Sequence, residues 1–218
     1  MEKTLRVIAD NLDLLASGLG ITLLISLIVI VVGTIIGVFG GVGLLYGPRW
    51  LKAILRLYVD IIRGTPLLVL MFLLFYALPE MGVAISGFQA VTVALSLFAG
   101  AHVSEIVRGA VSAVPNGQTD AARSLGLTFV PTVRHVILPQ AVPTALPPWT
   151  NTAIEMVKAT SLAYLLSVSD LLFRTQNVVE RTGVAMPFYL TAAVIYVLVN
   201  IAISRFGLWM ERRTRFAS

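Results

Sequence analysis

Several polar side chains gather near the end of an apolar, proline-rich stretch and could act on a ligand: Asn151, Glu155, Lys158, Thr160 and Ser161. An ionisable residue at membrane depth is costly and usually functional. If Glu155 met an ammonium or guanidinium group and Lys158 a carboxylate, the pair would suit an amino acid, because a zwitterion needs both signs. Glu155 and Lys158 are three residues apart, however, so on a helix they could equally neutralise one another. Both interpretations stay open.

The composition predicts that these side chains are positioned by membrane-spanning helices. Of the 218 residues, 57% are hydrophobic and 12% charged, and the mean hydropathy is +0.90. A helix needs about 20 mostly apolar residues to cross a bilayer, which leaves room for roughly five spans with short loops. We expect an all-α membrane protein with a single transmembrane domain over residues 1–218. The absence of cysteine excludes disulfides, thiolate metal sites and cysteine nucleophiles.

The apolar runs predict where the spans lie. We expect them at about 18–45, 55–78, 88–111, from 139 onward, and at about 188–209. Residues 159–173 are apolar but short for a full span, which favours a half-helix or a membrane-embedded hairpin arm. The fourth span contains Pro139, Pro143, Pro147 and Pro148. Because irregular backbone is tolerated at membrane depth only when buried in protein or lining water, this span is assigned to a pore.

Two details of the first two spans leave alternatives. Gly33 and Gly37 place small residues on one helix face, which permits close contact with another helix, although glycine can also be tolerated facing lipid. Arg63 could pair with Glu105 or anchor at the cytoplasmic interface, and Thr65 with Pro66 could form a kink.

The distribution of basic residues predicts an orientation. Eleven of the 16 Lys and Arg residues fall in one set of connections, and such residues accumulate on the cytoplasmic side. The amino terminus is therefore expected outside and the carboxyl terminus inside. The other five are Lys3, Arg6, Lys158, Arg174 and Arg181. The net charge of +5 does not imply nucleic-acid binding, since placement matters more than the sum in a membrane protein.

The connection from 115 to 139, on the expected cytoplasmic side, is longer than a simple turn requires. Good helix formers predict a short surface helix over 118–125, with Asn116 or Thr119 as a candidate N-cap and Gly126 as its stop. Ala121 and Ala122 leave the backbone unobstructed and Leu125 offers an apolar contact, a shape suited to docking in a groove of another protein. From shape alone, an ordinary amphipathic surface helix is the alternative.

The spacing of this loop is similar to the EAA loop of bacterial ABC-importer permeases. That pattern has an acidic residue, two alanines, a glycine four positions later and a downstream Ile-Leu-Pro, matched here by Asp120, Ala121, Ala122, Gly126 and 137–139, with aspartate in place of glutamate. Four further segments resemble the polar amino acid branch, the histidine, glutamine and arginine permeases: RGTPLL at 63–68, EIVRG at 105–109, LPQA at 138–141 and KATSL at 158–162.

The resemblance implies a type I ABC importer permease (MetI-like) in the bacterial inner membrane. Its partners would be ATPase subunits that bind ATP and Mg, a second permease chain, the same or homologous, and a periplasmic or lipid-anchored solute-binding protein that delivers a polar amino acid. The coupling residues implied are Gly117, Asp120, Ala121, Ala122, Leu125 and Gly126. Arg63, Thr65, Pro66, Glu105 and Pro139 would be structural or gating residues. The chain has no Walker A pattern, so the ATPase must be another polypeptide.

Two other classes of function are alternatives for an apolar chain of this kind. An intramembrane enzyme would need a Ser/His pair, paired aspartates or HExxH, and the aspartates Asp10, Asp13, Asp60, Asp120 and Asp170 all fall outside the expected spans or at their ends. A secondary transporter driven by an ion gradient would be expected to show two related halves or several broken helices. The sequence contains one broken helix and no clear repeat, so this remains the alternative.

Overall fold

In a computed structural model, residues 7–8 and 10–215 are described, and the regular elements of that part of the chain are all helices. Three helices are long and apolar enough to cross a membrane, and up to five spans result if each of two bent helix pairs counts as one. The long ones are α2 (Leu12–Tyr46), α6 (Gly87–Ser112) and α11 (Ala185–Arg215). The others are α3 (Arg49–Gly64), α4 (Leu67–Phe72), η1 (Leu73–Ala77), α5 (Leu78–Glu80), α7 (Asn116–Ser124), α8 (Phe129–Thr132), η2 (Val133–Ile137), α9 (Leu138–Ala159), η3 (Thr160–Leu166) and α10 (Leu171–Thr182).

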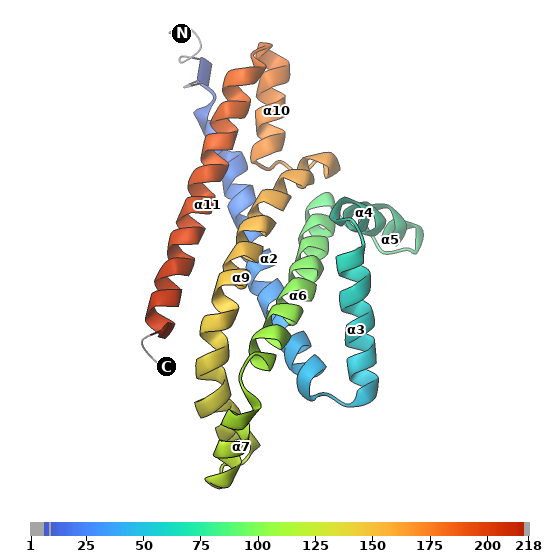
Figure 1. The fold of residues 1–218 in the computed structure, drawn as a ribbon. Helices are drawn as coiled ribbons and strands as arrows, with labels where there is room; N and C mark the ends of the chain where they lie inside the picture. The colour runs from blue at the N-terminus through green and yellow to red at the C-terminus, as the bar shows by residue number, and fades with distance from the viewer. Residues whose placement is uncertain (1–6, 9, 216–218) are drawn as a thin grey trace.

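The long helices run side by side along the bundle (Figure 1). The short helix α7 lies at one end, and α10 with the beginning of α2 lies at the other. The beginning of α2 and the end of α11 point to opposite ends, as an odd number of crossings requires.

The glycines of α2 form a contact face against α6. A Cβ atom added at Gly33 would lie 2.6 Å from Ala99 Cβ, and one added at Gly41 would lie 2.6 Å from Val107 Cβ. Gly37 meets Val103 in the same way. Of the two interpretations of Gly33 and Gly37, close helix contact is therefore correct: small residues let the two backbones approach, which is how helices associate where lipid weakens the hydrophobic driving force.

This contact face yields a stability prediction. Replacing Gly37 with Ala should lower the free energy of unfolding by about 1–3 kcal/mol, because an added methyl group overpacks a tight interface. Gly20 is the matched control, since it lies in the same helix with no atom within 4 Å of an added Cβ. Thermal unfolding in detergent measures both variants, and equal melting temperatures for Gly37→Ala and Gly20→Ala would contradict the packing argument.

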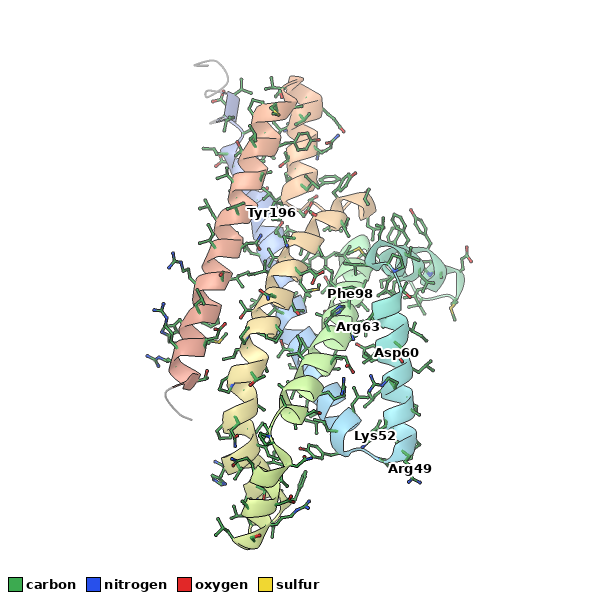
Figure 2. All side chains as sticks on the ribbon, in the orientation of Figure 1. Arg49, Lys52, Asp60, Arg63, Phe98 and Tyr196 are labelled. Carbon is green, nitrogen blue, oxygen red and sulfur yellow. The ribbon has the colours of Figure 1, made fainter. Side chains whose placement is uncertain are left out.

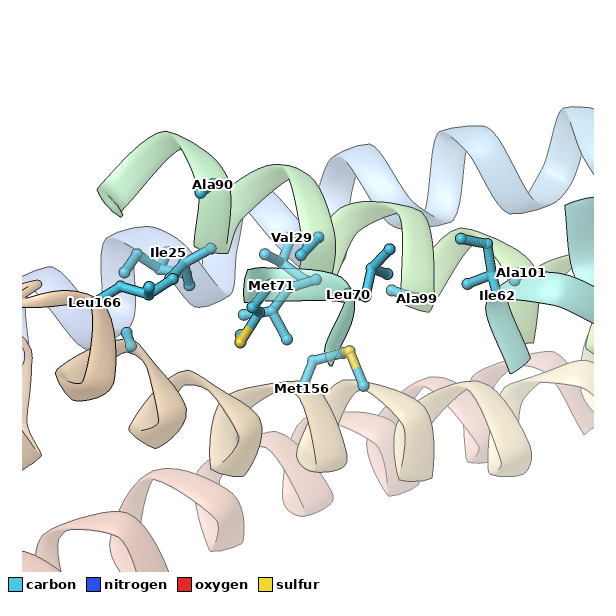
Figure 3. Packing of buried hydrophobic residues seen from close by; sticks show 14 of the residues in the cluster. Ile25, Val29, Ile62, Leu70, Met71, Ala90, Ala99, Ala101, Met156 and Leu166 are labelled. Atoms are coloured by element: carbon cyan, nitrogen blue, oxygen red, sulfur yellow. The ribbon is translucent and has the colours of Figure 1, made fainter. Parts of the chain in front are cut away.

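The second expected span, 55–78, is sharply bent at the place where Thr65 and Pro66 predict a kink. The chain bends by 107° between α3 and the segment Leu67–Glu80. Thr65 and Pro66 are extended, and Pro66 occupies the N-cap position of α4. After the bend, Met71 is fully buried and packs into the central cluster of apolar side chains that also contains Ile25, Val29, Ala99 and Met156 (Figure 3). An average of hydropathy over a window of residues detects the apolar run but not the change of direction.

Both π turns precede a proline by one residue. η1 ends at Ala77 before Pro79, and η2 ends at Ile137 before Pro139. A proline ring clashes with the carbonyl four residues earlier in a regular α-helix, and the wider π turn relieves that clash. The continuation into α9 as a single helix therefore accommodates the Ile-Leu-Pro sequence without a break.

Candidate functional site

The loop from 115 to 139 carries the short helix α7 at one end of the bundle (Figure 1). The helix α7 begins at Asn116 after Pro115, so neither Asn116 nor Thr119 serves as its N-cap. Gly126 ends it as expected: its φ is +79°, and the amides of Gly126 and Leu127 donate to the carbonyls of Arg123 and Ala122 at 2.9 and 3.1 Å. This is the hydrogen-bond pattern of a glycine-terminated helix.

The two alanines of the loop lie on opposite faces of α7. Ala122 is 3% exposed and packs against the rest of the chain, whereas Ala121 and Gly117 are exposed. The expectation that both alanines present open backbone is therefore wrong for Ala122. Leu125 is 82% exposed, an unusual state for a large apolar side chain outside a lipid-facing helix. Asp120 is exposed as well. Gly117, Ala121 and Leu125, spaced four residues apart, together form one exposed face of the loop, which we name the docking face after the role proposed for it below.

Gly126 gives a second prediction. The left-handed backbone conformation of Gly126 is unfavourable by roughly 1–2 kcal/mol for a residue that has a Cβ atom. Gly126→Ala should therefore destabilise the end of α7 by about that amount. Gly117 is the comparison, because it lies within α7, has ordinary backbone angles and has open space around an added Cβ. Hydrogen exchange of residues 120–128 should accelerate in Gly126→Ala and not in Gly117→Ala; equal protection in the two variants would contradict the prediction.

The polar residues of α9 share one exposed face. Asn151, Glu155 and Lys158 are exposed, and they continue a line that begins at Thr144 and Pro148. The spacing of four, three, four and three residues keeps all five on one side of the helix. We name this line the polar stripe of α9. Pro148 was expected in a pore-lining span, whereas Thr144 was not singled out, although its spacing of seven residues from Asn151 places it on the same helix face.

The prolines of α9 add backbone acceptors beside the stripe. Pro143, Pro147 and Pro148 lie inside the helix and carry no N–H group. The carbonyls four residues before them therefore lack the usual helical donor. An exposed helix face with side-chain charges and spare carbonyls is suited to a hydrated path and unsuited to hydrocarbon.

The other two residues expected on the path lie differently. Thr160 is fully buried, and its hydroxyl donates to the Val157 carbonyl at 2.7 Å. Ser161 is partly buried and donates to the Lys158 carbonyl at 2.7 Å. The two hydroxyls satisfy the end of α9, where the chain tightens into η3. Within the described part of the chain, no ion pair joins Glu155 to Lys158, and both side chains are exposed.

Glu105 ties α3 to α6. Its carboxylate accepts from Arg56 Nη1 at 3.0 Å and from Arg108 Nη2 at 2.7 Å. Arg63, one of whose two expected roles was to pair with Glu105, is not among these partners, and Arg56 was not expected. Arg63 lies at the end of α3 opposite Arg49 and Lys52, as Figure 2 shows, so it does not lie with the basic residues that follow α2 either. Thr65 donates to the Ile61 carbonyl at 2.7 Å, which supports the bend before Pro66.

A buried polar group joins the other end of the bundle. Asp170 is fully buried, and its carboxylate caps α10 by accepting from the Phe173 amide at 2.8 Å. Tyr196 of α11 donates to the same carboxylate at 3.4 Å, and Thr22 of α2 accepts from the Leu171 amide at 3.1 Å. Asp170 thus stabilises packing among three helices. In residues 7–8 and 10–215, no group of three His, Asp or Glu side chains could hold a metal ion.

Comparison with known proteins places this geometry in a family. Residues 30–216 match the family described as binding-protein-dependent transport system inner membrane component. The chain belongs to this family. It is the membrane-spanning component of a binding-protein-dependent ABC transporter, which makes the ion-gradient transporter incorrect and identifies a permease subunit in place of an enzyme.

Two relatives of the permease illustrate the match. It is 36% identical over 187 residues to the probable amino-acid ABC transporter permease protein YckA of Bacillus subtilis, covering 86% of this chain and 83% of that protein. It is 32% identical over 206 residues to the glutamine transport system permease protein GlnP of Escherichia coli, covering 94% of each.

Two solved structures agree with the fold of the permease. A crystal structure of an amino acid ABC transporter with histidines superposes with a TM-score of 0.88 at 32% identity, covering 94% of this chain and 96% of that one. The inward-facing MetNI methionine ABC transporter gives a TM-score of 0.77 at 24% identity, covering 92% and 96%, which supports the type I architecture.

Proposed function

We propose that this permease imports amino acids and that the polar stripe of α9 forms the translocation path against a second permease chain, identical or homologous. The stripe is the observation that carries the proposal, because it is an exposed polar face in a bundle built to sit in lipid. Glu155 would bind the amino or guanidinium group of the substrate and Lys158 its carboxylate, with Asn151 donating or accepting between them. The buried Thr160 and the capped Ser161 would shape the end of the path. The relatives named for glutamine and amino-acid transport support this cargo.

The docking face of α7 would receive an ATPase subunit, which holds ATP and Mg. Gly117, Ala121 and Leu125 would contact that subunit, Asp120 would make a polar contact at the rim, and Ala122 and Gly126 would fix the shape of the helix. Closure of two ATPase subunits would then move α7 and rock the permease pair between two states. The bend at Arg63, Thr65 and Pro66, the Glu105 tie and the π turn before Pro139 are the elements we assign to gating.

The proposed orientation places α7 in the cytoplasm of a bacterial cell and the beginning of α2 outside the inner membrane. Arg49, Lys52, Arg123 and Arg134 lie toward the α7 end, in keeping with the accumulation of basic residues on the cytoplasmic side. Lys3 and Arg6, counted on the other side, lie outside the described residues. A periplasmic or lipid-anchored solute-binding protein would dock at the α10 end, and the chain would act as one transmembrane domain.

Reconstitution tests the function directly. The permease, an ABC ATPase and a solute-binding protein encoded beside it are placed in liposomes, and uptake of labelled glutamine, histidine and arginine is measured with ATP enclosed. We expect uptake that requires the ATPase, ATP and the binding protein together. Uptake driven by an ion gradient without the ATPase would overturn the proposal, as would ATP-dependent uptake of none of these amino acids by the assembled complex.

A further inference from the structure

An apolar chamber lies near the α7 end of the bundle. It has a volume of about 430 Å³, within the range of small-ligand sites, about 300–1,000 Å³. Side chains of α2, α6 and α9 form its wall. Among them Val38, Val42, Leu138 and Val142 are each more than 40% exposed, so the chamber is a groove that opens on the outside of the bundle.

The deep wall of this groove offers no polar group to a ligand. Thr34 and Trp149 both line it, but Trp149 Nε1 donates to Thr34 Oγ1 at 2.9 Å and each satisfies the other. A polar occupant would lose its hydrogen bonds to water and gain none there. The lining of this part therefore suits a hydrocarbon chain.

A second chamber of about 320 Å³ continues from the first. The two share five wall residues: Leu45, Tyr46, Val111, Val133 and Ile137. The second chamber is polar, because Arg123, Asn116 and Thr119 line it beneath α7. Tyr46 stacks edge to face on Phe129 at 5.0 Å between ring centroids, and both rings wall this polar chamber.

The charge around the polar chamber is positive. Arg123 enters its lining, and Arg134 and His135 are exposed on η2, whose Val133 and Ile137 wall both chambers. Arg123 is the charged side chain that lines the polar chamber, and Asp120, the acidic residue of α7, does not line it. An apolar groove that ends in a basic, hydrogen-bonding chamber matches an amphiphile with an anionic head.

We propose that the two chambers together hold one anionic phospholipid of the surrounding membrane, with an acyl chain in the apolar chamber and the phosphate headgroup beside Arg123. The headgroup would tie α7 to the ends of α2 and α6, so the lipid would stiffen the helix that contacts the ATPase. Placement in the cytoplasmic leaflet rests on the proposed orientation, whereas binding itself does not depend on transport. A second copy of this chain explains the two chambers less well, because it would not account for a basic chamber at the end of an apolar groove.

Fluorescence quenching tests the proposal without ATP or substrate. In a background of Trp50→Phe and Trp209→Phe, Trp149 is the remaining tryptophan. The full chain is placed in phosphatidylcholine nanodiscs that contain increasing fractions of phosphatidylglycerol or phosphatidylcholine with brominated acyl chains. One basic residue near a membrane surface favours an anionic lipid by about fivefold in binding constant. We therefore expect half-maximal quenching of Trp149 at an about fivefold lower fraction of brominated phosphatidylglycerol.

Three variants locate the two parts of the lipid. Arg123→Gln should abolish the preference for phosphatidylglycerol, whereas Arg49→Gln should keep it, because Arg49 is an exposed arginine of α3 that lines neither chamber. Ala145→Phe fills the apolar chamber and should reduce quenching by both lipids. Melting temperatures verify that each variant is folded. If Ala145→Phe does not fold, Arg123→Gln still decides the test, because Arg123 is exposed and its replacement should leave the fold intact.

Specific outcomes would overturn the proposal. Equal quenching by the two brominated lipids, or a preference that survives Arg123→Gln, would exclude a headgroup site at Arg123. Quenching that Ala145→Phe leaves unchanged would exclude an acyl chain in the groove. If neither lipid quenches Trp149, a protein surface such as a second copy of the chain covers the chamber.

Discussion

Glu155→Gln should raise the substrate concentration needed for half-maximal uptake by about ten- to hundredfold. A hydrogen bond to a charged group contributes about 1.5–3 kcal/mol, and each 1.4 kcal/mol is a factor of ten in affinity. Glutamine keeps the shape of the side chain and removes its charge, so the variant should assemble normally. Uptake by proteoliposomes with enclosed ATP provides the measurement.

Glu80→Gln is the matched control for this substitution. Glu80 is an exposed glutamate of α5, in the segment that leaves the bundle to the side, away from α9 (Figure 1). Its replacement should leave uptake unchanged. Normal uptake by Glu155→Gln would remove Glu155 from the path, and an equal loss in both variants would point to a general effect of charge.

Leu125→Ala should weaken association with the ATPase subunit by about thirtyfold. An apolar side chain that is 82% exposed on a projecting helix has the character of an interface anchor, and truncation of such anchors costs about 2 kcal/mol or more. Leu125→Met keeps the apolar volume and should bind almost normally. Affinity measured with the purified ATPase distinguishes the two. Unchanged affinity in Leu125→Ala would place the docking contact elsewhere on the loop.

Local sequence signals anticipated much of the helical framework. The expected spans 18–45, 88–111 and 188–209 lie within α2, α6 and α11, because long apolar runs have little alternative in lipid. The boundaries extend further than expected, since amphipathic ends such as Leu12–Ser17 are helical without being apolar throughout. The stop at Gly126 was also readable, because a helix end in the left-handed region strongly favours glycine.

Features that depend on contacts between residues far apart in the sequence could not be predicted in full. Pro66 marks the place of the bend after Gly64, but not its size or direction: beyond it Met71 is buried in the same apolar cluster as Met156, and the sequence does not state which helices meet. The Glu105 carboxylate accepts hydrogen bonds from Arg56, 49 residues away in the sequence, as well as from its neighbour Arg108. The segment 159–173 contains a change of direction: η3 ends at Leu166, Ser167 follows with a φ of 57°, and α10 begins at Leu171 after a bend of 50°. A left-handed serine is a tertiary compromise that no local propensity predicts.

The π turn η2 also sets the rotational phase of α9. A π turn absorbs one extra residue in the helical ladder, and one residue corresponds to about 100° of rotation about an α-helix. If Val133–Ile137 kept all five residues but wound as a regular α-helix, α9 would turn by about that angle relative to α8. Under the proposed function, the docking face of α7 would keep its place while Glu155 and Lys158 would point away from the path. The winding of this turn, as much as any side chain in it, is therefore part of the connection that we propose between α7 and the polar stripe of α9.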